Sequence, residues 1–529
     1  MSNKKRIVLL GAGYGGLLTA KKLANKLKND NQVEITLIDK NPYHTMRTEL
    51  HEVAAGRVSE ESIRINLKKI FAGRKVNVVL DEINDIDFKE KVLKSKNTKY
   101  EYDYLVMGTG SKQTFFGIPG AQENTFKLWD FDDAVKLKEQ ILHMFREAVK
   151  ETNKEKRQKM LTFVVVGGGF TGIEMIGELG EWKDRLCEDF YIDKEEVKLY
   201  VVDGAPKILQ ILSDNLIKKA EKRLKKLGIE IVTGAGITEV SKDSVTLGDK
   251  GKIDTYTTIW AAGVEGSDIL GKVDIEQKGR KRIVTNDKLQ AVDYNNVYVV
   301  GDNIFYIVEG QERPVPQMVE NAEHSAPLVA NNIYKDIKGG EKKSYKPTFH
   351  GCMVCIGSRY GVATVGMPGK MFGMTGFMAM FIKHFINLVY FFQVAGFNKC
   401  CSYLLHEFFH TKDNRSFVGG CFAKASSNLW LLPLRIFIGY KWLEQGHGVI
   451  GLLLILGLFT DIALIISIAV AAMTWTSGIA TMDMLWYIIS GIALIGSGST
   501  FGLDYYVIPA FKKAWKKIGI IKKSYLYID

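Results

Sequence analysis

Two glycine-rich loops of the same kind constrain this chain more than any other feature. The first, GAGYGG at residues 11–16, follows an apolar run at 6–10, and the second, GGGFTG at 167–172, follows an apolar run at 161–166. Each loop precedes a stretch able to form a helix. A strand, a GxGxxG turn and a helix N-terminus together bind a dinucleotide diphosphate. The chain is therefore predicted to hold two dinucleotides, which favours electron transfer between them.

An acidic residue follows each loop at the position that would contact a ribose. Asp39 ends a predicted strand at 33–38, and Asp203 ends another at 197–202. A carboxylate there binds the free 2′-hydroxyl of NAD and repels the 2′-phosphate of NADP. No arginine directly follows Asp203, although Lys207 is near, so the second loop is predicted to bind NADH. The residues expected to do so are Gly167, Gly169, Phe170, Thr171, Gly172, Glu174, Asp203, Ala262 and Gly263.

Two further glycine-bearing strand ends resemble elements of two-dinucleotide flavoproteins. One strand runs into Gly108-Thr109-Gly110, and another at 296–300 ends in Gly301-Asp302. The resemblance implies non-covalent FAD at the first loop, with Asp302 at its ribityl or pyrophosphate region. The residues expected to bind FAD are Gly11, Gly13, Tyr14, Gly15, Gly16, Asp39, Lys40, Gly108, Thr109, Gly110, Gly301, Asp302 and Val319.

Cysteine usage narrows the class of flavoprotein. Disulfide reductases of this superfamily carry a CxxxxC on the first long helix, and this chain has no cysteine before Cys187. Sulfide:quinone reductases use cysteines near the flavin, and Cys187 and Cys352 do not clearly match them. Cys352 and Cys355 form one CxxC in a strand-like run, without a second pair, so buried thiols are expected and no metal site is predicted.

Several segments resemble type II NADH dehydrogenases, single-subunit NADH:quinone oxidoreductases that pump no protons. They are NPYH at 41–44, LHEVAAG at 50–56, FGIPG at 116–120, the second glycine loop through Glu174, WAAG at 260–263 and RPVP at 313–316. The likeness spans roughly residues 5–420. It implies that FAD stays bound, that NADH reduces one flavin face and that quinone approaches the other. Glu174 then contacts the nicotinamide; otherwise it is a favourable carboxylate in the first turn of its helix.

One stretch departs from that family. Where an AQxAxQ quinone signature is usual, this chain has VENAEH at 319–324, so Glu320 and His324 replace the two glutamines. Four residues apart, they share one helix face. Either they form an ordinary surface pair, or they line the acceptor site, where His324 could protonate a reduced quinone.

The C-terminal third is expected to meet a membrane. Residues 377–392 are apolar and aromatic but contain Lys383 and His384, so a helix lying in the interface is favoured over a span. Lys383 either reaches the flavin or quinone site or extends to lipid headgroups. Apolar runs at 429–442, 449–473 and 484–495 are typical of transmembrane helices, and 434–439 with 451–460 resemble the small DoxX membrane proteins. If the middle run breaks at Thr460-Asp461, the three apolar runs form four helices instead of three.

These features predict an α/β protein of two Rossmann-like domains, interfacial helices and an all-α membrane bundle. The expected domains are 1–120 and 269–365 for FAD, 121–268 for NADH, 366–425 for interfacial helices, and 426–529 for a bundle with a basic tail that includes Lys516. The expected site is the cytoplasmic face of the inner membrane, since NADH is cytoplasmic and the net charge of +12 suits anionic lipid. The sequence contains no stripe of basic residues with interleaved aromatics, so nucleic acid is not expected as a partner.

The predicted activity is transfer of hydride from NADH to FAD and of electrons to a membrane quinone of menaquinone or ubiquinone type. The predicted assembly is compatible with a homodimer. Two alternatives stay open at this point. One is an NADH dehydrogenase that feeds a non-quinone acceptor, such as an extracellular electron-transfer chain. The other is a redox-sensing membrane scaffold.

Overall fold

A computed structural model describes residues 4–409, 415–416, 428–478, 483–515 and 517–524. The chain divides into two compact units, Met1–Ala423 and Lys424–Asp529. The predicted interfacial segment at 417–425 and Lys516 lie outside the described residues.

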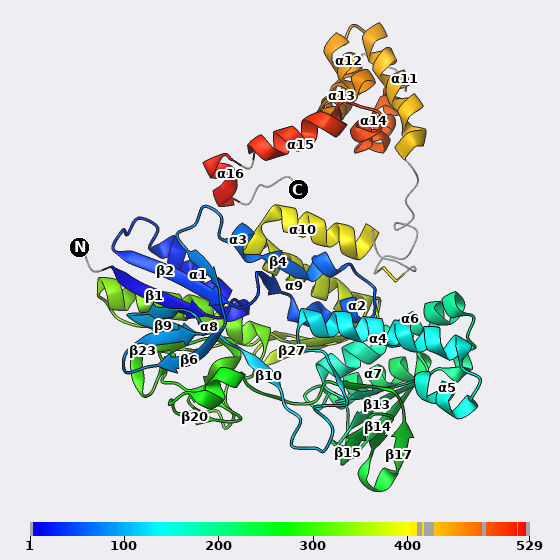
Figure 1. The fold of residues 1–529 in the computed structure, drawn as a ribbon. Helices are drawn as coiled ribbons and strands as arrows, with labels where there is room; N and C mark the ends of the chain where they lie inside the picture. Colours follow the sequence, from blue (N-terminus) through cyan, green and yellow to red (C-terminus); the bar gives the residue numbers. More distant parts are fainter. Residues whose placement is uncertain (1–3, 410–414, 417–427, 479–482, 516, 525–529) are drawn as a thin grey trace. The chain divides into compact units, whose positions relative to one another are not determined.

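The first sheet of the larger unit combines strands from residues 5–107 with two strands from residues 290–299 (Figure 1). Its order is β22 (Gln290–Ala291), β23 (Tyr294–Val299), β9 (Tyr104–Met107), β1 (Lys5–Leu10), β2 (Val33–Asp39) and β5 (Asn77–Leu80). All neighbours are parallel except β22 and β23. Helices α1 (Tyr14–Lys26) and α8 (Val319–Lys338) pack against each other beside it. The carboxyl ends of β1, β9 and β23 therefore meet at one edge.

The second sheet lies in the segment between β9 and β22. Its strands are all parallel, in the order β11 (Phe126–Lys127), β18 (Thr257–Trp260), β12 (Thr162–Val166), β13 (Lys198–Asp203) and β14 (Ile229–Thr233). Its core includes Val164, Val202 and Trp260, all buried, as apolar strands between covering layers are. Helices α4 (Phe131–Lys150), α6 (Phe170–Phe190) and α7 (Asp214–Lys226) belong to the same region.

Shorter elements complete the larger unit. They are β3 (Tyr43–Thr45) with β4 (Arg64–Asn66); β6 (Ile83–Asp87), β7 (Val92–Ser95) and β8 (Lys99–Glu101); β10 (Ser111–Gln113) with β19 (Val264–Gly266); β15 (Glu239–Ser241), β16 (Ser244–Thr246) and β17 (Lys252–Asp254); β20 (Gln277–Lys278), β21 (Arg282–Val284) and β24 (Ile304–Phe305); and the helices η1 (Arg47–Glu49), α2 (Leu50–Ala54), α3 (Leu67–Ile70) and α5 (Lys154–Met160).

An antiparallel sheet of β25 (Gly351–Cys355), β26 (Gly361–Met367) and β27 (Lys370–Gly376) leads into α9 (Phe377–Ala395), α10 (Phe397–Leu404) and a π-helical turn (Leu405–Phe409). Within the described ranges, α9 is the one helix long and apolar enough to cross a membrane, yet 44% of its apolar window is buried in the protein. Lys383 and His384 are on its buried face, whereas Phe381 and Phe385 are more than half exposed.

The smaller unit is helical: α11 (Leu431–Glu444), α12 (Gly448–Leu456), α13 (Thr460–Thr476), α14 (Asp483–Leu494), α15 (Asp504–Trp515) and α16 (Gly519–Ser524). The predicted run at 449–473 is broken, because Gly457 and Phe459 take positive φ and the Asp504 carboxylate accepts the N–H groups of Phe459 and Thr460. At about 1.5 Å per residue, none of these helices reaches the ~30 Å of a hydrocarbon core. The transmembrane prediction for this unit is thus not confirmed.

Candidate active site

The two glycine loops have the same backbone geometry. Gly11 and Gly167 have φ of +99° and +116°, where glycine is favoured. A Cβ on Gly16 would overlap the carbonyl oxygen of Gly11, and a Cβ on Gly172 would overlap that of Gly167. Each helix therefore begins so close to its strand that only glycine fits.

The middle glycine of each loop faces open space instead. A Cβ built on Gly13 or on Gly169 meets no atom within 4 Å. These residues are the N-caps of α1 and α6, and neither makes a side-chain cap. The first N–H groups of both helices are thus accessible to an anion, which fits a diphosphate at each position.

Asp39 and Asp203, the two predicted ribose ligands, accept hydrogen bonds from the backbone of these loops. Asp39 accepts the N–H groups of Ala12 and Asn41 at 2.6 and 2.8 Å. Asp203 accepts those of Gly168 and Ala205 at 2.5 and 2.7 Å. Each carboxylate thus fixes its loop and keeps free lone pairs for ribose hydroxyls.

A cleft beside the first loop suits the long FAD molecule. Its volume is about 910 Å³, and its lining includes Gly11, Asp39, Lys40 and Thr109. That volume lies in the range of cofactor pockets. Four of the predicted FAD residues are thereby brought to one cleft.

Asn303, which follows Gly301-Asp302, connects that element to the predicted FAD element at Gly108–Gly110. Asn303 was not identified from the sequence. Its side-chain amide accepts the N–H of Gly110 at 2.9 Å and donates to the Gly110 carbonyl at 2.8 Å. The Ser111 hydroxyl donates to Asp302 at 2.6 Å. An Asn after Gly-Asp carries no recognisable signal, because its partner is 193 residues away.

Helix α8 begins against the same elements. The Gly301 N–H donates to Ser325 Oγ at 3.1 Å, and a Cβ on Gly301 would touch Ala322. Val319, the first residue of α8, is half-buried. A Cβ on Gly108 would contact the Gly16 backbone at 3.4 Å, so the three predicted FAD elements converge on the first loop.

Tyr14 and His44 connect the first loop to α9. The His44 ring contacts the Ala12 carbonyl at 2.9 Å through Nδ1 and the Tyr390 hydroxyl at 2.8 Å through Nε2. Tyr14 packs edge-on against His44 and also against Tyr390. Burial lowers the pKa of His44 to about 4, so this ring is neutral at physiological pH. Helix α9 is thus attached to the first glycine loop.

At the second loop, Phe170 and Thr171 open α6 and are at least partly exposed. Ala262 and Gly263 follow β18, but Gly263 lies under the Phe116 ring, and a Cβ there would overlap it. We expected Gly263 to admit a cofactor. In this structure the half-exposed Phe116 ring covers Gly263, and contact of Gly263 with the cofactor stays a prediction.

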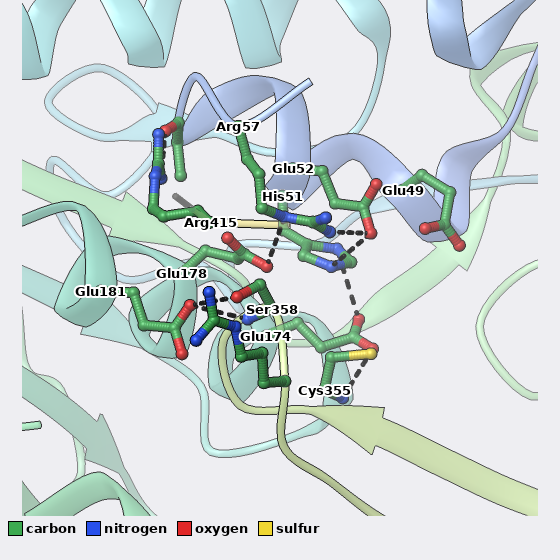
Figure 2. A network of polar contacts seen from close by, with 12 residues as sticks. Glu49, His51, Glu52, Arg57, Glu174, Glu178, Glu181, Cys355, Ser358 and Arg415 are labelled. Carbon is green, nitrogen blue, oxygen red and sulfur yellow. Dashed lines mark hydrogen bonds and ion pairs between the residues drawn. The ribbon is translucent and has the colours of Figure 1, made fainter. Parts of the chain in front are cut away.

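Figure 2 shows a cluster of polar and charged side chains around Arg57 and His51. Arg57 is its centre: it forms an ion pair with Glu52, lies 3.1 Å from Glu178 and lies 2.8 Å from Glu407, with all four side chains at most 1% exposed. The residues come from α2, the loop after it, α6 and the π-helical turn.

Lys383 extends this cluster from α9. Its Nζ lies 2.7 Å from Glu49 and 2.6 Å from Glu52, and Asn387 donates to Glu49 at 3.0 Å. Lys383 therefore points into the protein and does not extend toward headgroups.

Glu174 enters the cluster from the side of the second loop. It lies 3.7 Å from His51 Nδ1 and accepts the Cys355 N–H at 3.3 Å. It is the fifth residue of α6, whose first turn holds no acidic residue, so the predicted first-turn position is wrong. Residues from both dinucleotide regions and from α9 thus meet.

Carboxyl groups outnumber cations in this cluster. Burial raises the pKa of Glu174 to about 8, and burial together with neighbouring Glu52 raises that of Glu49 to about 7. Burial would also raise the pKa of Glu52, but Arg57 and Lys383 hold it well below its usual range. Glu174 therefore carries a proton at neutral pH, whereas Glu52 is ionised.

Of the CxxC pair, Cys355 is buried as predicted, whereas Cys352 is partly exposed. Cys187, Cys352, Cys355, Cys400 and Cys401 are all free among the described residues. Burial raises the pKa of the Cys355 thiol well above its usual range, which disfavours the reactive thiolate.

Glu320 and His324 do share a face of α8, with 3.6 Å between the carboxylate and Nε2. The structure adds His350, whose Nδ1 lies 2.6 Å from Glu320. Sequence reasoning missed His350 because it lies in an extended segment outside the helix.

Comparison with known proteins agrees with this geometry. Residues 5–326 match the pyridine nucleotide-disulphide oxidoreductase family. The type II NADH:quinone oxidoreductase of Staphylococcus aureus is 33% identical over 398 residues, which are 74% of this chain and 97% of that protein. The corresponding protein of Staphylococcus epidermidis is 33% identical over 399 residues, with the same coverage. The chain belongs to the type II NADH:quinone oxidoreductase family.

A solved structure shares the fold. NDH2 from Plasmodium falciparum in complex with NADH superposes with a TM-score of 0.68 at 18% identity, over 78% of this chain and 99% of that one. The family confirms the predicted enzyme class, an FAD-dependent NADH dehydrogenase, and the two predicted dinucleotides. No comparison shows the DoxX likeness.

Proposed function

We propose that this protein oxidises NADH and passes two electrons to a membrane quinone, with FAD on the loop at 11–16 and NADH on the loop at 167–172. One observation carries the proposal. Two glycine loops of the same geometry stand on one chain, and a residue from each predicted dinucleotide-binding region, Glu52 and Glu174, contributes to a single buried cluster around His51.

The chemistry requires a proton in addition to the hydride. NADH and one proton convert a quinone to a quinol and NAD⁺, and bound FAD supplies the carrier that accepts the hydride and releases the electrons. Glu174 holds a proton at neutral pH and lies beside His51, so it is placed to exchange that proton within the cluster. Lys383 fixes Glu49 and Glu52.

The membrane is proposed to lie against the outer face of α9. Large apolar side chains are exposed along this face: Phe377, Met378, Phe381, Phe385, Ile386, Val389 and Phe392. A row of this kind on a helix whose other face is docked fits insertion into one leaflet. Tyr390 of the same helix touches His44 at the FAD cradle, which gives a quinone in the lipid a short approach.

We assign residues 1–120 and 269–365 to FAD, 121–268 to NADH, 366–425 to the membrane interface and 426–529 to a membrane-embedded bundle. Exposed apolar residues on α11, α13 and α14, such as Phe437, Ile465 and Trp486, support the last assignment. The NADH-binding region faces the cytoplasm, where NADH is available.

Purified protein in lipid nanodiscs tests the activity. NADH is expected to bleach the flavin absorbance rapidly, and added soluble quinone is expected to restore it with steady turnover. Rapid bleaching without quinone turnover would instead establish a different electron acceptor. Slow bleaching would exclude an enzymatic role.

A further inference from the structure

Three side chains beside the start of α8 are arranged as metal ligands. Glu320, His324 and His350 each offer one ligand atom, and these atoms all lie within 4.8 Å of one another. His350 Nδ1 is 2.6 Å from Glu320 Oε1, and His324 Nε2 is 3.6 Å from the same oxygen. In tetrahedral zinc sites with bonds of about 2.0–2.1 Å, ligand atoms are about 3.3 Å apart, which falls between these two distances.

The local structure holds the three groups in place. Glu320 and His324 are one turn apart on α8, and the N–H of His350 donates to both Glu320 oxygens at 3.1 Å. The His350 carbonyl accepts the Gly366 N–H at 2.9 Å, which ties this residue to β26. The planes of the two imidazole rings are inclined by 29°, with centroids 6.2 Å apart.

One ligand atom also lacks a hydrogen bond. His324 Nε2 is shielded from solvent and has no hydrogen-bond partner among the described residues, since its distance to Glu320 exceeds hydrogen-bonding range. A buried ring nitrogen without a donor or acceptor is costly unless something else binds it. A cation between Nε2 and the carboxylate would satisfy it.

We propose that Glu320, His324 and His350 bind a divalent transition metal of the zinc class, with one coordination position left for water or another ligand. Two imidazoles and one carboxylate suit zinc. His350 is about half exposed, which provides an entry path from solvent. The buried trio of His51, Glu174 and Cys355 is a poorer candidate, because the ammonium of Lys383 beside it repels a cation.

Equilibrium dialysis of the untagged full-length protein against Zn²⁺ tests this site. The wild type is expected to bind one more zinc than the H324A/H350A double variant, whose affinity at this site should fall by at least about tenfold. H143A, which removes an exposed histidine on α4, should bind zinc as the wild type does. X-ray absorption of the zinc form should show two imidazole nitrogens.

Flavin content and flavin bleaching by NADH report whether each variant is folded, independently of quinone turnover. Equal zinc stoichiometry and affinity in the wild type and in a folded double variant would overturn the proposal. E320Q gives a second check, because it keeps the helix and removes the charge. It should weaken zinc binding while the flavin spectrum stays unchanged.

Discussion

The ammonium of Lys383 lies 2.6 Å from the Glu52 carboxylate, in a pocket where both side chains are at most 7% exposed. The two residues are 331 positions apart in the chain. This ion pair joins α9, whose outer face exposes large apolar side chains, to α2. One helix, α9, therefore contributes both to the buried charged cluster and to the exposed apolar surface.

Replacing Lys383 with Met should leave Glu49 and Glu52 buried without their common partner. Breaking a buried ion pair costs about 3–5 kcal/mol. We expect the Lys383→Met variant to release its flavin at a lower midpoint urea concentration than the wild type, as measured by flavin fluorescence. Lys150→Met, which removes an exposed lysine paired with Glu147, is the matched control and should not move the midpoint. An unchanged midpoint for both variants would show that the pair is not structural.

Glu174→Gln should change how stability depends on pH. The pKa of Glu174 is raised from 4.5 to about 8, so between these values the folded state binds the extra proton and wild-type stability falls as pH rises. Glutamine does not titrate. The Tm of the variant relative to wild type should therefore increase from pH 5 to pH 8 and then level off. Exposed Glu195→Gln should show no such trend, and a flat difference for Glu174→Gln would contradict the raised pKa.

Matched substitutions in the two glycine loops can separate FAD binding from NADH binding. A Cβ on Gly13 or Gly169 meets no protein atom within 4 Å, so alanine at either position should fold and intrude only on the ligand. Gly13→Ala should lower the flavin content of the purified protein. Gly169→Ala should retain flavin but raise the KM for NADH by about tenfold or more. The same defect in both variants would refute the assignment of one dinucleotide to each loop.

Asp203→Asn should weaken the preference for NADH. Asn retains an oxygen that can accept the Gly168 N–H, but it loses the charge that repels a 2′-phosphate. The ratio of kcat/KM for NADPH to that for NADH should rise by about tenfold. Asp39→Asn, at the equivalent position of the first loop, should leave this ratio unchanged. A ratio that responds equally to both substitutions would overturn the assignment.

Phe381→Asp and Phe385→Asp place charges on the exposed face of α9. Burying a charge in the interface is unfavourable. Because the proposed bundle would anchor the full chain by itself, the assay uses the unit Met1–Ala423, in which the double variant should bind liposomes at least about tenfold more weakly on flotation. Val149→Asp on α4, an equally exposed apolar site, should bind as wild type does. Undiminished flotation of the α9 variant would place the lipid contact elsewhere.

The sequence was sufficient for features set by neighbouring residues. The close packing of Gly16 and Gly172 against the start of their own loops was predictable from the glycine spacing. The positions of Asp39 and Asp203 were predictable because each residue ends a strand that the sequence pattern indicates. Glu320 and His324 were paired correctly because helix periodicity is local. Arg57 could not be predicted, since its partners Glu178 and Glu407 are 121 and 350 residues away. His350 was missed for the same reason: only tertiary packing brings its segment to α8.

The two-sided character of α9 has a practical consequence. Removing the segment from Phe377 onward to obtain a detergent-free enzyme would also remove Lys383 and Tyr390, and with them the counter-charge of Glu49 and the partner of His44. A water-soluble version of the larger unit must therefore keep α9 and replace its outer phenylalanines with polar residues, while every inward-pointing side chain of the helix is retained.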